Sequence, residues 1–476
     1  MNVSNLIRIS LYRENNQTVK RQMLFTCLSK IKEKMDMKST FLRYCFWIND
    51  CLKGSPIRRP YAEIKWICEH DEETTRKVRS RKLDEILEYA CSNTSFYARY
   101  IGKGINHFPV MDKGALIENA EAISVPLSKI PNQKGEVYIQ KTSGSTGIPL
   151  AIPQDTQKRQ RRIADLKYFG QLVGYKTHEP LIHLRIWNKW QKKTQKQISR
   201  ENIFPFDCSD LSDERLHELC DLIIRTKAVA IRAYASCLDL LAKFVKRNPH
   251  YVFQNLKIAF STSEMLHDDT RANVKRYLKC EIISQYADEE CGIIAQERIP
   301  TKEDNNVMYL NYADYYIEFL KLESDEPAGF GDLARIVITD LHNHAFPIIR
   351  YDCGDTGELM PPDEYSRGYP VLGKLYGRKM DMVYTTSGVP FSPMLLGRTV
   401  KNFNVIKQWQ FIQKGERNYV LKTILEEGGN VEELGSLLDE LKHTIGIDAT
   451  ISIEVVNNIP LLKSGKRKVV VNEWCK

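Results

Sequence analysis

The sequence lacks the cysteine and histidine patterns of metal-binding and disulfide-rich proteins. Its 476 residues include 12 cysteines, but there is no Cys-x-x-Cys pair and no zinc-like quartet of cysteine and histidine. His342 and His344 stand near Cys353, yet their spacing matches no standard metal site. We therefore expect neither a zinc ribbon nor a disulfide scaffold, and we interpret both histidines as structural.

Long apolar runs and internal repeats are also missing. No stretch approaches the roughly 18–20 apolar residues of a membrane span, and the N-terminal residues contain no uninterrupted apolar core of a signal peptide. A reducing compartment is the simplest setting for a chain with this cysteine pattern. We expect a cytoplasmic protein with no membrane span.

The excess of positive charge is too weak to indicate a nucleic-acid partner. Lys and Arg number 69 and Asp and Glu number 60, which gives a net charge of +9. A basic run at 159–162 and a cluster of Trp187, Trp190 and neighbouring lysines fit no RNA-binding motif. We interpret both as solvated surface and expect no nucleic acid among the partners.

The chain is long enough for more than one hydrophobic core, and 42% of its residues are apolar. The segment 80–101 has apolar residues at helical spacing, which predicts a helical start. Between 130 and 355, short β-rich runs alternate with the helical patterns 213–226 and 236–247. This alternation predicts an α/β domain.

The texture of the sequence changes after about residue 380. Strand-like segments cover 407–413, 418–425 and 450–456, and a helix is predicted between the capping residue Asn430 and Gly446, with Glu433 completing a capping box. Its apolar stripe consists of Val431, Leu434, Leu438, Leu441 and Ile445. We expect a large N-terminal α/β domain over 1–379 and a small C-terminal α+β domain over 380–476.

The segment from Tyr138 to Pro149 runs from a strand into a loop of hydroxyls and glycines, Thr142-Ser-Gly-Ser-Thr-Gly-Ile-Pro149. Glycines let backbone N–H groups turn toward one point and hydroxyls add donors, a combination that can hold phosphate oxygens. The loop is neither Walker A nor the dinucleotide motif. Taken alone, a Ser/Gly run of this kind can equally be a plain surface loop.

This loop resembles the phosphate loop of adenylate-forming enzymes, a superfamily that includes acyl-CoA synthetases, peptide-synthetase adenylation domains and luciferases. Four further motifs follow in the same order: Ser284-Gln-Tyr-Ala-Asp-Glu-Glu290, Arg350-Tyr-Asp-Cys-Gly-Asp355, Gly377-Arg-Lys-Met-Asp381 and Pro460-Leu-Leu-Lys-Ser-Gly-Lys466. Within the superfamily, the chain is most similar to phenylacetate-CoA ligase and the CapK capsular-polysaccharide group, over roughly residues 80 to 470.

The resemblance implies a role for each motif. It implies that Thr142, Ser143, Gly144, Ser145, Thr146 and Gly147 hold phosphate, that Tyr286 lies by the adenine, that Glu290 binds Mg²⁺ and that Asp355 holds the ribose hydroxyls. Arg378 belongs to the hinge motif and is expected in the nucleotide site, and Lys466 reaches the acyl-adenylate. The acyl pocket is expected to draw on Tyr234, Ser236, Ser261 and Ala287.

The implied activity is an ATP- and Mg²⁺-dependent ligase that forms an acyl-adenylate from a small carboxylic acid and passes the acyl group to a thiol, either coenzyme A or a carrier. Two alternatives stay open. One is transfer to an amine in surface-polysaccharide biosynthesis, and the other is a catalytically degenerate nucleotide-binding protein. The resemblance also implies that the small domain rotates about the Met380 region, which closes Lys466 over the site for adenylation and withdraws it for transfer. A homodimer is compatible with this interpretation.

Overall fold

Helices open the described part of the chain. The computed structural model describes residues 37–141, 150–185, 187, 193–209, 211–299, 306–378, 383–388, 390–391, 396, 399–400, 402–460 and 469–474. The first helices are α3 (Met37–Leu52), α4 (Arg58–Glu69) and α5 (Glu72–Asn93). The Asp71 side chain caps α5 by accepting a hydrogen bond from the Thr74 N–H. The predicted helical start is confirmed, although α5 begins earlier and ends sooner than the segment 80–101.

A mixed sheet of 11 strands dominates residues 37–378, which we call the large region. Its strand order is β10-β11-β12-β13-β9-β8-β7-β6-β5-β3-β4. The strands are β3 (Leu181–Arg185), β4 (Ile203–Asp207), β5 (Ala230–Tyr234), β6 (Ile258–Thr262), β7 (Glu281–Ala287), β8 (Ile293–Glu297), β9 (Met308–Leu310), β10 (Tyr315–Leu320), β11 (Leu333–Asp340), β12 (Tyr351–Met360) and β13 (Val371–Arg378).

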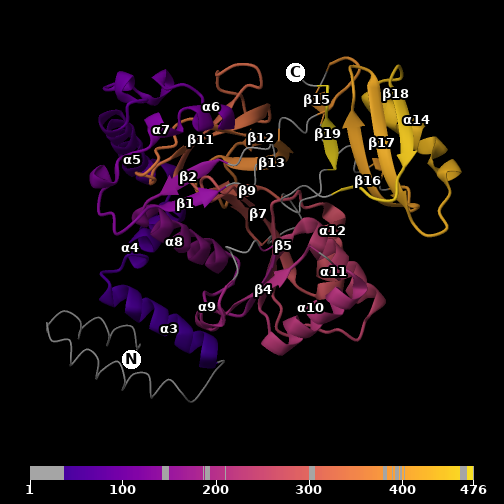
Figure 1. Cartoon of the computed structure of the whole chain (residues 1–476), viewed down its shortest axis with the longest axis horizontal. Helices are drawn as coiled ribbons and strands as arrows, with labels where there is room; N and C mark the ends of the chain where they lie inside the picture. Colours follow the sequence, from indigo (N-terminus) through magenta and orange to yellow (C-terminus); the bar gives the residue numbers. More distant parts are fainter. Residues whose placement is uncertain are drawn as a thin grey trace.

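One half of this sheet is parallel. Strands β3 to β7 pair in parallel, and the helices α9 (Gln195–Glu201), α10 (Asp213–Thr226), α11 (Ala235–Arg247) and α12 (Asp268–Asn273) lie between them in the chain. The helices α10 and α11 pack one face of the sheet through a buried apolar cluster (Figure 1). Strands covered on both faces read as short apolar runs, which explains why the sequence revealed β5 and β6.

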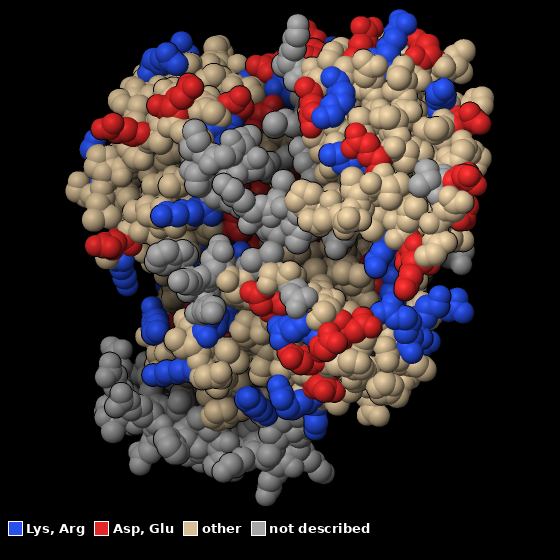
Figure 2. Space-filling view, turned by 45° about the vertical axis from the view of Figure 1, so that its right-hand side comes forward, with Lys and Arg blue, Asp and Glu red and all other residues tan. Residues whose placement is uncertain are grey.

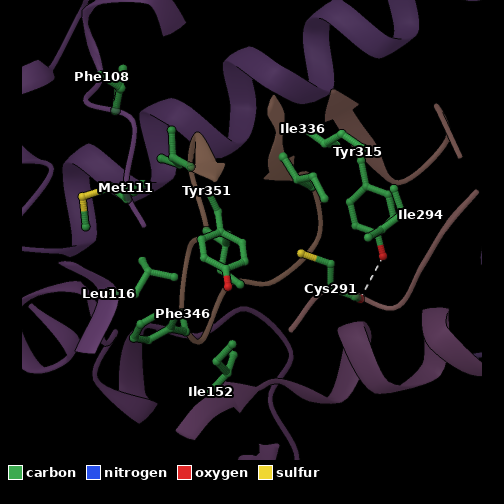
Figure 3. Packing of buried hydrophobic residues seen from close by; sticks show 14 of the residues in the cluster. Phe108, Met111, Leu116, Ile152, Cys291, Ile294, Tyr315, Ile336, Phe346 and Tyr351 are labelled. Carbon is green, nitrogen blue, oxygen red and sulfur yellow. Dashed lines mark hydrogen bonds between the residues drawn. The ribbon is translucent and has the colours of Figure 1, made fainter. Parts of the chain in front are cut away.

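The other half, from β8 to β13, is antiparallel and packs against α5, the short helices α6 (Lys113–Glu118) and α7 (Ala120–Ile123), and the hairpin of β1 (Tyr138–Lys141) and β2 (Ala151–Gln154). Figure 3 shows this core, where Ile336 and Tyr315 face Cys291, and Tyr351 lies near Met111 and Phe346. This apolar cluster includes Tyr286 of β7 and Tyr351 of β12, so it packs two of the predicted motifs against each other.

Helix α8 (Thr156–Leu172) corrects one prediction, because its basic run at 159–162 is not a solvated face. Arg161 is only 5% exposed and forms ion pairs with Asp314 at 2.5 Å and Glu63 at 2.9 Å. One turn earlier, Lys158 is fully buried, and its Nζ lies 2.6 Å from Asp340 Oδ2. The run was misread because each acidic partner lies about a hundred residues or more away in the sequence.

Residues 383–474, which we call the small region, form a second, four-stranded sheet with the order β18-β17-β16-β19 (Figure 1). Its strands are β16 (Ile406–Gln413), β17 (Asn418–Leu425), β18 (Thr450–Val455) and β19 (Val470–Asn472), preceded by the two-stranded pair β14 (Val383–Tyr384) and β15 (Pro390–Phe391). The predicted strands are confirmed here. Strands β18 and β19 lie at opposite edges of the four-stranded sheet.

The predicted C-terminal helix is a 3₁₀ turn at Val431–Leu434 followed by α14 (Gly435–Ile445), with the capping box of Asn430 and Glu433 in place. The buried stripe contains Leu437, while Leu438 is half-buried. This shift by one residue follows the change from three residues per turn to 3.6 at Gly435. Helix α14 covers the small sheet, so the small region is α+β.

The fold class is thus confirmed as α/β, with a large α/β region and a small α+β region. Among the residues that the structure describes, no helix is both long and apolar enough to cross a membrane. Acidic and basic side chains are interspersed over the face shown in Figure 2. The described residues of that face form no continuous basic surface of the kind that a nucleic acid backbone would require.

Candidate functional site

Two predicted nucleotide motifs that lie far apart in the sequence meet in the structure. Tyr286 is on β7 and Asp355 is on β12, and the Tyr286 hydroxyl donates a hydrogen bond to Asp355 Oδ2 at 2.8 Å. The same hydroxyl lies 3.3 Å from Cys353 Sγ. Burial and the Asp355 carboxylate raise the pKa of Tyr286 well above its usual range. The phenol therefore stays neutral and serves as a donor that orients this carboxylate.

An acidic turn follows β7 directly. Asp288 Oδ1 accepts hydrogen bonds from the N–H groups of Cys291 at 2.6 Å and Gly292 at 3.1 Å, which closes the turn. Gly292 has a φ of 127°, and an added Cβ would lie 3.1 Å from the Tyr315 hydroxyl. Glycine is therefore required there. Burial and the neighbouring Glu290 charge raise the pKa of Asp288 to about 8.

Glu290, the predicted metal ligand, is 8% exposed. Its Oε1 accepts a hydrogen bond from the Tyr351 hydroxyl at 3.4 Å, and its carbonyl oxygen accepts one from Gln154 Nε2 at 3.4 Å. Glu289 points elsewhere, because its Oε2 accepts from Gln140 Nε2 at 2.6 Å. The two adjacent carboxylates thus have different partners, one on β12 and the other on the β1 strand of the hairpin.

Side chains of helix α8 support the acidic turn. Arg162 Nη1 donates to the Glu289 carbonyl at 2.9 Å, and the Tyr315 hydroxyl donates to the Cys291 carbonyl at 2.8 Å. Lys158 Nζ in turn donates to the Tyr315 hydroxyl at 3.4 Å. The backbone on both sides of Glu290 is therefore fixed by side chains from α8 and β10. The basic run that the sequence presents as surface is part of the support of this site.

The predicted acyl-pocket residues lie at the carboxyl ends of the parallel strands. Tyr234 ends β5 and is in register with Thr262 of β6, which is in register with Gln285 of β7. Ser236 is in the first turn of α11, and its N–H donates to Glu264 Oε2 at 2.8 Å. Carboxyl ends of parallel strands are the usual place for a ligand crevice in an α/β fold.

Ser261 and Ala287 complete the predicted pocket set. Ala287 is half-buried at the end of β7, whereas Ser261 is fully buried on β6 and its hydroxyl has no hydrogen-bond partner. Glu264 Oε1 is also buried without a partner. These two buried polar atoms lie at the same strand end, which marks the carboxyl end of β6 as a polar position.

Several predicted site residues lie outside the described residues. They are Thr142, Ser143, Gly144, Ser145, Thr146 and Gly147 of the predicted phosphate loop, and Lys466. Their flanks are described: the loop is joined to Lys141 at the end of β1 and to the buried Leu150 before β2. Arg378 ends β13, and its backbone is in register with Asp355. The hinge residue Met380 is also outside the described residues.

Sequence reasoning assigned no role to three side chains at this site: Gln140, Tyr351 and Cys353. Two signals were available, since Tyr351 and Cys353 lie inside the Arg350–Asp355 motif and Gln140 stands just before the predicted phosphate loop. Cys353 was set beside His342 and His344, but the structure places its Sγ at the Tyr286 hydroxyl instead.

Comparison with known proteins agrees with this geometry. Residues 383–473 match the family model described as the CapK C-terminal domain. Protein CapK of Staphylococcus aureus is 21% identical over 436 residues, which cover 87% of this chain and 92% of CapK. Along most of both sequences the chain is similar to CapK, which confirms the predicted resemblance. Phenylacetate-coenzyme A ligase of Pseudomonas putida is 23% identical over 225 residues, but these cover only 44% of this chain and 49% of that enzyme.

The fold of this CapK-like chain is shared with a solved acyl-CoA ligase. The structure of 2-hydroxyisobutyryl-CoA ligase in its postadenylation state matches with a TM-score of 0.65 at 16% identity, covering 83% of this chain and 89% of that one. The match spans far more than the small region. The resemblance first indicated by five short motifs therefore extends to the tertiary structure.

The acidic turn fits a magnesium ion that arrives with nucleotide phosphates. Mg²⁺ prefers oxygen ligands and usually combines one or two protein carboxylates with phosphate oxygens and water. Among the described residues, no group of three or more His, Cys, Asp and Glu is arranged to hold a metal ion. Glu290 supplies one nearly buried carboxylate, which suits an ion shared with a nucleotide.

Proposed function

We propose that this chain is an ATP- and Mg²⁺-dependent ligase that activates a carboxylic acid as its acyl-adenylate and transfers the acyl group to a thiol. The observation that carries the proposal is the contact between Tyr286 and Asp355, which lie 69 residues apart. It brings the two predicted nucleotide motifs together beside the acidic turn. Similarity to CapK and to phenylacetate-coenzyme A ligase supports the same class of reaction.

In the first half-reaction, a carboxylate oxygen of the acid bonds to the α-phosphorus of ATP and pyrophosphate leaves. Asp355, an acceptor oriented by Tyr286, suits hydrogen bonds from the two ribose hydroxyls. Bound Mg²⁺ would offset the negative charge of the phosphates. Lys466, carried by the small region, would oppose the charge that develops on the α-phosphate. Positioning and electrostatics thus supply the rate, and no covalent enzyme intermediate is needed.

In the second half-reaction, the sulfur of the acceptor bonds to the acyl carbon and AMP leaves. Coenzyme A or a carrier-protein thiol is the acceptor that similarity to acyl-CoA ligases supports. An amine acceptor in surface-polysaccharide biosynthesis is the second candidate, and the resemblance to the CapK capsular-polysaccharide group is what suggests it. The chain retains Asp355, Glu290 and Lys466, which argues against a degenerate protein that only binds nucleotide.

A pyrophosphate-release assay with Mg²⁺ and ATP tests the proposal directly. It should be run over aryl, fatty, hydroxy and dicarboxylic acids, with and without coenzyme A. At least one acid should release pyrophosphate without any acceptor. Asp355→Asn should raise the KM for ATP roughly 10- to 100-fold, because a hydrogen bond to a charged group contributes about 1.5–3 kcal/mol, and should leave the KM for the acid nearly unchanged.

Asp352→Asn is the matched control on the same strand. Asp352 accepts the Gly354 N–H at 2.9 Å and pairs with Arg335 at 2.8 Å, away from Tyr286. The control should retain the wild-type KM for ATP. If none of the acids in the panel led to release of pyrophosphate, the proposed function would be contradicted. An equal rise of the KM for ATP in both variants would contradict the role of Asp355.

A further inference from the structure

Three basic side chains share one face of the parallel half of the sheet. His183 and Arg185 are on β3, and Arg232 is on β5 directly opposite His183 in the parallel register. Alternate residues of a strand face the same side, so these residues share a face with Tyr234, which is two positions beyond Arg232. All four are half-buried. We call His183, Arg185 and Arg232 the β3–β5 basic face.

The side chains of this face are packed on aromatic rings rather than on carboxylates. The guanidinium carbon of Arg232 lies 5.0 Å from the centre of the Phe260 ring, and that of Arg185 lies 5.5 Å from the Trp187 ring. The His183 ring is 5.3 Å from the same tryptophan. Arg232 Nε is buried and has no hydrogen-bond partner. Across the described residues, neither arginine forms an ion pair.

The carboxylate in register with this face already has hydrogen-bond partners. Asp207 on β4 is in register with Arg185, but its carboxylate accepts hydrogen bonds from the Trp187 N–H at 3.1 Å and from the N–H and hydroxyl of Ser209. Lys193, the other cation beside His183, is paired with Glu201. Within the described part of the chain, no carboxylate is therefore ion-paired with Arg185 or Arg232, and the nearby Glu264 acts on Tyr234 instead.

Such an arrangement costs free energy unless a ligand completes it. A buried charge without a counter-charge is strongly unfavourable, and contact with an aromatic face offsets only part of that cost. Burial lowers the pKa of Arg232, opposed only by Tyr175, and the pKa of His183 lies well below its usual value through burial, Arg232, Arg185 and Lys193. A guanidinium matches a carboxylate or phosphate through two parallel hydrogen bonds.

The position of the face relates it to the acyl pocket. Tyr234 stands at the carboxyl end of β5, and β6 and β7 follow in the sheet. Neighbouring strands are about 4.8 Å apart, so β5 lies about 10 Å from β7, the strand of Tyr286. A substrate that reacts beside β7 and extends across the strand ends would bring its far end to β5 and β3.

We infer that the β3–β5 basic face binds a second anionic group of the acid substrate, at the end remote from the carboxylate that is activated. The inference rests on the proposed function and narrows it. The substrate class is a carboxylic acid that carries a further carboxylate or phosphate several bonds away. Phe260 and Trp187 orient the two guanidinium groups, and Tyr234 lies along the route between the two ends.

The test compares each dicarboxylic acid with its own monomethyl ester. Glutaric, adipic and suberic acids and their monomethyl esters are supplied with Mg²⁺ and ATP, and pyrophosphate release is measured without any acceptor. For at least one chain length, the diacid should exceed its ester in kcat/KM by roughly 10- to 100-fold, the range expected for a hydrogen bond to a charged group. Equal kcat/KM values for all three pairs would overturn the inference.

Arg232→Met removes the charge and keeps an unbranched side chain of similar length. It should lower kcat/KM for the preferred diacid roughly 10- to 100-fold through KM, and leave its ester unchanged. Arg232→Lys should restore part of the preference. The matched control is Arg298→Met, since Arg298 is also half-buried, lies 4.3 Å from the Tyr309 ring and has an unpartnered Nε. This control should keep the diacid preference.

Three outcomes separate the possible failures. If no acid releases pyrophosphate, the proposed function fails, whereas activation of monoesters and diacids alike overturns only the basic-face inference. If Arg232→Met leaves adenylation of every acid unchanged but raises the KM for coenzyme A relative to dephosphocoenzyme A, the face serves the acceptor's phosphate and the inference is overturned. Should Arg232→Met not fold, Arg185→Met and the wild-type ratio of diacid to ester still decide the question.

Discussion

The large and small regions differ in the burial of their ion pairs. In the large region, Lys158 and Asp340 pair with both side chains fully buried, and Arg161 pairs with the buried Asp314. In the small region, the described ion pairs lie at the surface: Lys414 with Glu473, Arg417 with Asp448 and Lys422 with Glu454. A buried ion pair is costly to form but very costly to break on one side, whereas a surface pair contributes little.

The difference shows what each region must hold in place. The buried pairs of the large region connect α8 with β10 and β11, and α8 in turn fixes the acidic turn that carries Glu290. The small region has an apolar core of residues from β16, β17, β18 and α14. Under the proposed function, this region only has to carry the segment that contains Lys466, and apolar packing suffices for that.

The largest effect is expected from breaking one buried pair. Lys158→Met should lower the free energy of unfolding by about 3–5 kcal/mol, because it leaves the buried Asp340 charge without a partner. Lys422→Met, which removes an exposed pair in the small region, should cost at most about 1 kcal/mol. Urea unfolding followed by circular dichroism measures both.

The double variant Lys158→Met with Asp340→Asn is the control. It removes both charges, and the introduced asparagine keeps an oxygen acceptor for the His342 N–H, which Asp340 Oδ1 accepts at 2.9 Å. It should recover much of the lost stability. Equal losses for Lys158→Met and Lys422→Met would show that burial does not distinguish the two regions.

A second prediction sharpens the comparison in kinetic terms. Lys466→Ala should lower acyl-adenylate formation by roughly 10²–10³-fold, the effect of losing one well-placed donor at developing charge. Transfer from preformed acyl-adenylate should stay nearly unchanged, because the lysine is needed only when the α-phosphate reacts. The two half-reactions are measured separately by pyrophosphate release and by thiol or amine consumption.

Lys463→Ala and Lys468→Ala are the matched controls from the same basic run, and both should retain activity. Comparable losses at all three lysines would indicate a diffuse anion-binding tail. An intact adenylation rate in Lys466→Ala would contradict the proposed mechanism.

The acidic turn provides a smaller contrast within the large region. Glu290→Gln keeps the shape of the side chain but removes its charge, so the Mg²⁺ concentration for half-maximal pyrophosphate release should rise at least roughly 10-fold. Glu289→Gln should shift it little, because the Glu289 carboxylate is engaged with Gln140. A Mg²⁺ titration at fixed ATP measures both. Greater sensitivity at Glu289 would reverse the assignment of the two carboxylates.

The smallest effect concerns pH and a buried histidine of the large region. Burial, together with Lys167 and Arg43, lowers the pKa of His178 to about 4, below the value of about 6.5 in an unfolded chain. The unfolded state therefore binds more protons between these values, so stability present above pH 6.5 is lost as the pH falls toward 4. Between pH 7 and pH 5 the loss should be about 1–2 kcal/mol.

His178→Asn tests this contribution. Asparagine tolerates the φ of 67° at this position and carries no titrating group. The variant should show a shallower loss of melting temperature between pH 7 and pH 5 than the wild type. The same slope in both proteins would remove His178 as the cause.

The same contrast explains how far sequence reasoning reached. In the small region, the boundaries of β17 and the capping box of the 3₁₀ turn before α14 followed from the pattern alone, because local propensity and a one-sided apolar stripe decide both. In the large region, α10 was equally visible. The acidic partners of Lys158 and Arg161 were not visible, because Asp340 at the end of β11 and Asp314 in the turn before β10 lie far along the chain. Long-range polar contacts leave no local period in the sequence.

The candidate site divides in the same way. The order of five motifs predicted Tyr286, Glu290 and Asp355, and the resemblance that they carry is confirmed. Two contacts depend on the spacing of β7, β12 and the β1–β2 hairpin. They are the hydrogen bond between Gln140 and Glu289 and the one between the Tyr286 hydroxyl and Asp355. No short sequence motif determines the distances between elements that lie so far apart in the chain. The roles of the phosphate loop and of Lys466 stay predictions.

The strand order of the small sheet has a consequence for the order of folding. Strands β16 and β17 form a local hairpin, whereas β19 pairs in parallel with β16 through Phe411 and Val470, across a long loop of chain. Contacts that close long loops form late, because the loop must lose conformational entropy before the contact contributes any favourable free energy. We expect the hairpin to form first and β19 to dock last. The segment between β18 and β19, with Lys466, is then anchored at both ends only in the final step, so refolded protein should regain its core before it regains adenylation.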